Sequence, residues 1–208
     1  MPIKINGVDS PSTVNIASDS PKGAYGLAEY PNLYEVQRTN NFEFIVSDMD
    51  DILRAGAQGD ESNAHIENAQ DILRLSVVST LIPHFTQNVI QIRRGNSMIK
   101  AAGVPTFTSG NLVVNDYIGV DTKAVLMAWQ NLSYNVRTDK VGLMGDYKKT
   151  ATLVEYTPDY QIVRKWILYG CWISGLSEDS YNNENNEKHQ ITATIEYDKA
   201  VIDMSESV

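Results

Sequence analysis

The chain has 208 residues and a mass of 23.2 kDa, which fits one domain and allows a sizeable buried core. Its 17 lysines and arginines against 26 aspartates and glutamates give a formal net charge of −9, so a basic surface that wraps nucleic acid is not expected. The sequence contains no apolar run of about 18 residues, which is the length that a membrane-spanning helix needs, so no membrane span is predicted. The single cysteine, Cys171, excludes an internal disulfide framework and a zinc site built from several thiolates.

The first segment, residues 1–30, is rich in proline, serine and glycine and poor in large apolar side chains. This composition predicts an extended N-terminal arm, which is either disordered or ordered on a neighbouring subunit. This segment has no basic stretch followed by an apolar run, so no secretory signal is predicted here. Residues 31–208 are expected to form a single β domain.

Two strands are predicted early in that domain, with a long insertion between them. Phe42, Phe44 and Val46 alternate along the first strand, and a second β-type run covers Leu75–Ile82. The insertion, residues 48–71, is too long for an ordinary hairpin loop. Its apolar residues have helical spacing on both sides of a polar centre, so the insertion is expected to be partly helical.

A tight hairpin and one helix are predicted in the middle of the chain. The segment Arg94–Ser97 separates two β-type runs, and Gly95 suits the positive φ at the first position of a type II′ turn. The helix covers about residues 121–132, with Asp121 as its N-cap. Its buried stripe is expected to consist of Val125, Trp129 and Leu132.

A second, longer hairpin is predicted after the helix, with its turn at Thr157–Tyr160. Alternation along its second arm places Ile162, Trp166, Leu168 and Trp172 on one face and Val163, Ile167, Tyr169 and Ile173 on the other. Both faces are apolar and need cover. A last strand alternates over Ile191–Tyr197. The sequence therefore predicts a mainly β fold, an antiparallel sandwich or barrel of two packed sheets with one α-helix.

No catalytic motif was found among the nucleophile elbows, phosphate-binding loops and His-Glu-x-x-His patterns. The three histidines, His65, His84 and His189, are isolated in or beside predicted loops. Cys171 lies within an apolar strand, which favours a buried thiol over a nucleophile. The basic pairs, including Arg93-Arg94, are expected to split between opposite strand faces, so that no single pair forms a patch. We therefore expect no enzyme, no cofactor and no metal site.

Residues 73–201 contain a set of structural signatures, among them a helix and a strand that each carry tryptophan. The segments are Asp116–Asp121, Leu126–Trp129, Glu155–Asp159, Val163–Trp166, Gly170–Gly175 and Ile191–Asp198. They resemble the tail tube protein of contractile-tailed bacteriophages and the related tube subunits of contractile injection systems.

The resemblance implies a structural protein of the virion tail, assembled in the host cytoplasm, whose hexameric rings stack into a hollow tube. The implied partners are further copies of the chain, a surrounding sheath, and baseplate or terminator proteins, while phage DNA passes through the lumen without specific binding. In such proteins the position of the insertion matches a ring-contacting loop, so Ile52, Leu53 and Ile66 are candidates for ring stacking. The alternatives are a tube subunit of a contractile injection or bacteriocin-type system, and an enzyme with an unrecognised site.

Overall fold

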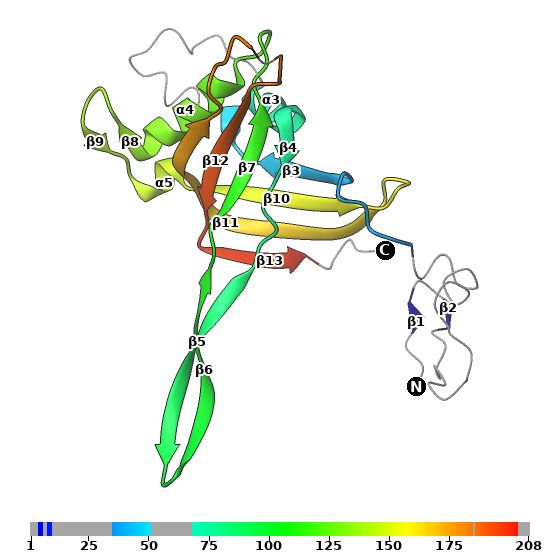
Figure 1. Ribbon diagram of the computed structural model, residues 1–208, viewed down its shortest axis with the longest axis vertical. Coiled ribbons are helices and arrows are strands. Elements are labelled where there is room, and N and C mark those ends of the chain that lie inside the picture. The colour runs from blue at the N-terminus through cyan, green and yellow to red at the C-terminus, as the bar shows by residue number, and fades with distance from the viewer. Residues whose placement is uncertain (1–3, 6–7, 10–34, 51–67, 185, 204–208) are drawn as a thin grey trace.

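A computed structural model describes residues 4–5, 8–9, 35–50, 68–184 and 186–203. One antiparallel sheet of seven strands dominates the fold, in the order β3-β10-β11-β12-β7-β4 with β13 paired to β11 (Figure 1). The strands are β3 (Phe42–Val46), β4 (Val77–Ser79), β7 (Gly110–Asn115), β10 (Lys149–Tyr156), β11 (Ile162–Glu178), β12 (Gln190–Glu196) and β13 (Lys199–Asp203). The predicted mainly antiparallel β fold is confirmed.

The long strand β11 joins the two halves of this sheet. Its first part pairs with β10 and β13, and its second part pairs with β12. The sheet curls, so that β12, β7 and β4 run steeply across β3, β10 and β13 (Figure 1). The two layers predicted from the sequence are thus the halves of one curled sheet, and the apolar core lies on its concave side.

Gly170 interrupts the alternation of side chains along β11. Its φ is +70°, and an added Cβ would overlap the carboxylate of Asp198. The register of β11 against β10 shifts at this point, so Leu168 and Ile173 are both buried in the core although they are five positions apart, an odd spacing that would place them on opposite faces of a regular strand. Continuous alternation, which placed Trp172 on the face of Leu168, is therefore wrong beyond Gly170.

The predicted helix is α4 (Thr122–Ser133). The carboxylate of Asp121 accepts a hydrogen bond from the Ala124 amide at 2.9 Å, which is the expected N-cap. Val125 and Trp129 are fully buried on the face of α4 that packs against β11. The helix, its cap and most of its buried stripe are confirmed.

The structure adds two short helices, α3 (Ala69–Ser76) and α5 (Met144–Tyr147). Leu73 and Ser76 are buried one turn apart, and the Ser76 hydroxyl donates to the Ile72 carbonyl at 2.6 Å. The strand predicted to begin at residue 75 is therefore wrong at its start, because helical packing extends α3 to Ser76 and only β4 remains extended. The predicted helical spacing near the end of the insertion is confirmed by α3.

Two small ladders lie outside the main sheet, β1 (Lys4–Ile5) with β2 (Val8–Asp9), and β8 (Tyr134–Asn135) with β9 (Lys140–Val141). The first pair falls within the predicted N-terminal arm. The division into an arm of residues 1–30 and a domain of residues 31–208 stays a prediction.

Candidate self-association surface

The third small ladder is a long hairpin that projects from the body of the protein (Figure 1). It consists of β5 (Phe85–Arg94) and β6 (Ser97–Phe107). Gly95 has a φ of +59° in the two-residue turn between them, as predicted. Every residue from Phe85 to Lys100 is exposed. Because a lone two-stranded hairpin is only marginally stable in water, this element lacks part of its packing in the isolated chain.

Aromatic side chains anchor the base of the hairpin to the sheet. The Phe85 and Phe107 rings lie 5.7 Å apart, and Phe107 lies 5.8 Å from the Tyr197 ring. The Tyr197 hydroxyl donates to the His84 carbonyl at 3.3 Å and accepts from the His84 amide at 3.2 Å. These contacts with Tyr197 fix the orientation of the hairpin relative to the sheet.

The outer half of the hairpin has one apolar and one polar face. Residues directly opposite each other in an antiparallel pair point to the same side. The observed register places Ile90, Ile92, Ile99 and Ala101 together on one face. It places Gln91, Arg93, Met98 and Lys100 on the other face. The sequence thus builds an amphipathic ribbon.

The apolar face of this ribbon is open to solvent. Ile90 is 52% exposed, Ile92 45% and Ile99 52%. Covering each of these side chains would stabilise an assembly by on the order of 1 kcal/mol. A contiguous exposed apolar patch of this kind marks an interaction site.

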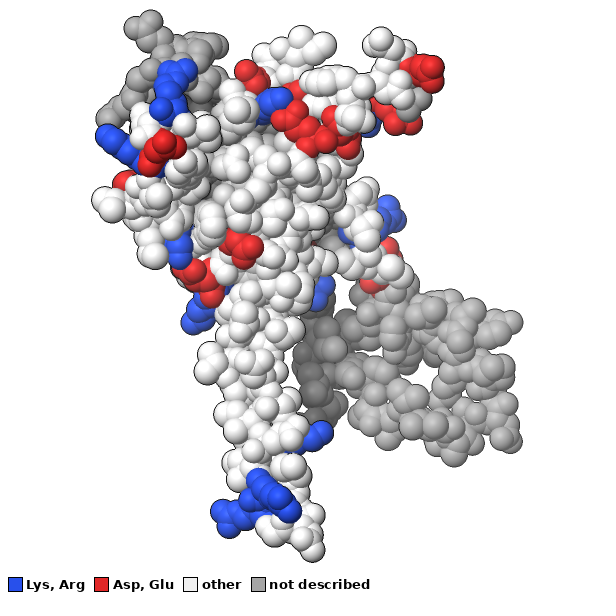
Figure 2. Space-filling view, turned by 60° about the vertical axis from the view of Figure 1, so that its left-hand side comes forward, with Lys and Arg blue, Asp and Glu red and all other residues white. Residues whose placement is uncertain are grey.

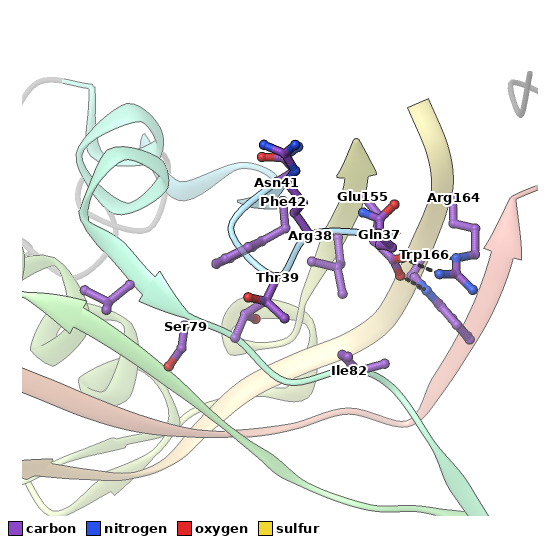
Figure 3. A pocket seen from close by; sticks show the side chains of 13 residues that line it. Gln37, Arg38, Thr39, Asn41, Phe42, Ser79, Ile82, Glu155, Arg164 and Trp166 are labelled. Atoms are coloured by element: carbon purple, nitrogen blue, oxygen red, sulfur yellow. Dashed lines mark hydrogen bonds and ion pairs between the residues drawn. The ribbon is translucent and has the colours of Figure 1, made fainter. Parts of the chain in front are cut away.

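A groove of about 610 Å³ opens where β4 and the segment after it face β3, β10 and β11. Figure 3 shows Phe42, Ile82 and Trp166 among its lining side chains. The Glu155 carboxylate accepts from Arg164 Nη2 at 2.8 Å and from Trp166 Nε1 at 3.1 Å. Both oxygens of this carboxylate are thus engaged, so it serves to link β10 to β11 and is not poised as a base.

A second polar cluster ties α3 to the sheet. Glu43 on β3 accepts hydrogen bonds from Arg74 on α3 and from the Tyr156 hydroxyl, the latter at 2.9 Å. Burial, and then the hydrogen bond to Glu43, raise the pKa of Tyr156 above its ordinary value. Because the Glu43 carboxylate is hydrogen-bonded to both partners, this cluster has a structural role and links α3 to the sheet.

The thiol of Cys171 is a core group, as predicted. Its side chain is fully buried, and Sγ lies 3.6 Å from the Leu168 carbonyl oxygen. Burial raises its pKa to about 12, which suppresses the thiolate that a nucleophile needs.

His84 is exposed, as predicted for a turn histidine, whereas His189 is partly buried. The His189 ring stacks on Tyr181 with centroids 4.8 Å apart, and its Nδ1 lies 3.2 Å from an Asp116 oxygen. His65 lies outside the described residues. Within the described part of the chain, no group of three or more acidic, histidine or cysteine side chains could hold a metal ion. The same part contains no helix long and apolar enough to cross a membrane.

The ring-stacking candidates Ile52, Leu53 and Ile66 also lie outside the described residues. The surface that the structure does show was missed by sequence analysis, which predicted the turn at Arg94–Ser97 but not the length or isolation of the hairpin. One signal was available, because the segment from Phe85 to Phe107 contains three basic residues and no acidic one in a chain of net charge −9.

The sequence matches no protein-family model and no curated protein. A chain of the sheath–tube complex of the extracellular contractile injection system PVC, in its extended state, is structurally similar, with a TM-score of 0.57 and 14% identity over 87% of this chain and 97% of that chain. A chain of the PVC sheath/tube terminator has a TM-score of 0.55 and 17% identity, over 80% and 95% of the two chains. This chain shares their fold.

The tube-terminating cap of the anti-feeding prophage AFP is also similar, with a TM-score of 0.51 and 14% identity over 81% of this chain and 91% of that chain. The alignments cover nearly the whole of each of these proteins. The fold predicted from the resemblance is therefore confirmed, and at these identities the likeness concerns the fold alone.

Proposed function

We propose that this chain is a structural, non-catalytic tube subunit of the contractile-injection type, whose copies close into rings of six that stack. The observation that carries the proposal is the projecting β5–β6 hairpin, anchored at its base and apolar along one face. The hairpin belongs to a chain whose fold is similar to that of proteins in sheath–tube and terminator assemblies.

Cyclic association supplies the packing that the isolated hairpin lacks. Each copy gives one ribbon to a neighbour and receives one, so every apolar face in a closed ring is covered. At on the order of 1 kcal/mol for each half-exposed isoleucine, covering Ile90, Ile92 and Ile99 contributes to the stability of every contact between neighbours in the ring. A monomer would leave the same side chains in water.

The proposed partners are further copies of the chain, a surrounding sheath, and terminator or baseplate proteins. A finer version places the tube in a phage tail, within a virion, where DNA passes through the lumen without specific binding. The two versions differ in what fills the bore and in what caps the tube. Purified particles with DNA-filled heads would support the phage version, and headless particles would support the injection system.

The insertion contributes a second candidate contact. Ile52, Leu53 and Ile66 are proposed to dock on the adjoining ring, because a polar segment with few apolar residues has little core of its own to join. Deleting residues 56–63 should then leave the fold intact and impair stacking. Normal tubes from that variant would contradict this assignment.

Native mass spectrometry and light scattering test the ring. We expect the full chain to give sixfold multiples that grow with protein concentration. The matched variant lacks residues 90–93 and 98–101, which shortens both strands equally and keeps the turn and the alternation of faces. It should fold and remain monomeric. A full chain that is monomeric at all concentrations would contradict the proposal.

A further inference from the structure

We infer that successive rings stack head to tail through a charge contact, in which the basic tip of one subunit's hairpin docks on an acidic end formed by two loops of a subunit in the next ring. The inference rests on the proposed function, since it names the partner surface of the same hairpin. Both surfaces lie on the described chain, at opposite ends of its long axis.

The hairpin tip carries only positive charge. Arg93, Arg94 and Lys100 lie within seven residues of the turn and are all exposed. Figure 2 shows basic side chains at the far end of the hairpin and no acidic side chains around them on the face in view. Arg94 and Lys100 make no ion pair within the described part of the chain. Their charge is available to a partner.

The other end of the molecule is defined by the direction of β7. This strand starts at Gly110, close to the base of the hairpin, and ends at Asn115, which lies opposite Gln190 of β12. The loop after β7, residues 116–121, and the loop before β12, residues 179–184 and 186–189, therefore meet at the end away from the hairpin (Figure 1).

These two loops, with the adjoining Glu178, are strongly acidic, and acidic side chains gather at this end in Figure 2. Together they carry six acidic residues and one lysine. The acidic residues are Asp116, Asp121, Glu178, Asp179, Glu184 and Glu187. Three of these are used internally, since Asp116 contacts His189, Asp121 caps α4 and Glu178 pairs with Lys123 at 2.8 Å.

The remaining three, Asp179, Glu184 and Glu187, are exposed and form no ion pair within the residues that the structure describes. Apolar side chains accompany them, because Ile118 is fully exposed and Tyr181 is 82% exposed. The two ends are therefore complementary in charge.

Charge also fixes the direction of stacking. Two tips facing each other would bring arginines and lysines together, and two loop ends would bring carboxylates together, and like charges in contact are costly. Only the tip-to-loop arrangement pairs opposite charges. Because the two surfaces lie at opposite ends of one axis, this contact does not close on itself and continues as a stack. The hairpin strands, at about 3.3 Å per residue, are roughly 33 Å long and can reach past their own domain.

The test uses two charge-reversed variants of the full chain. Arg94→Glu/Lys100→Glu makes the tip acidic, and Glu184→Lys/Glu187→Lys makes the loop end basic. Each alone should still form rings, with at least a tenfold loss of stacked tubes by negative-stain electron microscopy. A 1:1 mixture should restore tubes, because each acidic tip then meets a basic loop end and each basic tip meets an acidic one.

The matched control for the tip variant, Lys140→Glu/Lys199→Glu, changes the net charge by the same amount as that variant but lies outside the hairpin and the two acidic loops, and it should stack normally. Raising salt from 0.05 to 0.5 M should shorten wild-type tubes, because the charges are exposed and screened. Normal stacking by either reversed variant alone, or a mixture that stays unstacked, would overturn the charge contact while leaving ring formation intact. A wild-type chain that forms no rings would instead contradict the proposed function.

Discussion

Ile92 and Ile99 lie directly opposite each other across β5 and β6, and about half of each side chain is open to solvent. A cross-strand isoleucine pair of this kind is ordinarily buried, because both residues favour a packed sheet. Among the described residues, the hairpin that carries this pair packs against the rest of the protein at its base. The proposed ring would cover this exposed pair with a neighbouring copy.

Replacing both residues, as Ile92→Ser/Ile99→Ser, should separate folding from assembly. The melting temperature of the monomer should change little, since surface substitutions usually alter stability by less than about 0.5 kcal/mol. Ring formation should fall by more than tenfold, measured by native mass spectrometry. The control is Val136→Ser, because Val136 is 75% exposed but lies away from the hairpin. Rings of normal abundance from the double variant would count against the apolar face as a contact.

Gly170→Ala should destabilise the fold by about 1–3 kcal/mol, because the backbone has a positive φ there and the new Cβ would meet Asp198. Urea unfolding measures the loss. Gly175→Ala on the same strand is the control, since a Cβ there has no atom within 4 Å. Equal stability of the two variants would show that the positive φ of Gly170 is not required for the change of side-chain face along β11.

Asp121→Ala should cost about 1 kcal/mol of unfolding free energy, because the Ala124 amide loses its side-chain acceptor. Asp179→Ala removes the same charge from the neighbouring loop, where the carboxylate has no hydrogen bond within the described residues, and should be close to neutral. Thermal unfolding of both variants provides the comparison. A cap variant as stable as the wild type would refute the assigned role.

Alkylation by iodoacetamide should report the burial of Cys171. A pKa of about 12, against an ordinary 9.0, leaves about a thousandfold less thiolate at pH 8, and burial limits access further. The native protein should therefore be modified far more slowly than the protein in urea. Equal rates in both conditions would place the thiol at the surface.

The same shift predicts a pH dependence of stability. Because the folded pKa is raised, the thiol contributes its full stabilisation below about pH 9 and loses it as pH rises toward 12. Cys171→Ala removes the titrating thiol. The difference in unfolding free energy between wild type and variant should shrink between pH 8 and pH 10.5, and a difference independent of pH would contradict the assignment.

Much of the fold could be predicted from local sequence patterns. The cap at Asp121, the Gly95 turn and the alternation of β12 all follow from chemistry within a few residues, so the sequence predicts them. Two features depended on distant partners. The change of face at Gly170 involves Asp198, which is distant in sequence, and the isolation of the β5–β6 hairpin arises because no third strand among the described residues pairs with it. No local pattern encodes either feature.

Cryo-electron microscopy of the assembled protein is the most direct test of the proposed tube. We expect hollow stacks of six-membered rings in which the face of Ile90, Ile92 and Ile99 is buried against a neighbouring copy. Particles that remain single chains at every concentration, or tubes in which this face lies in solvent, would contradict it.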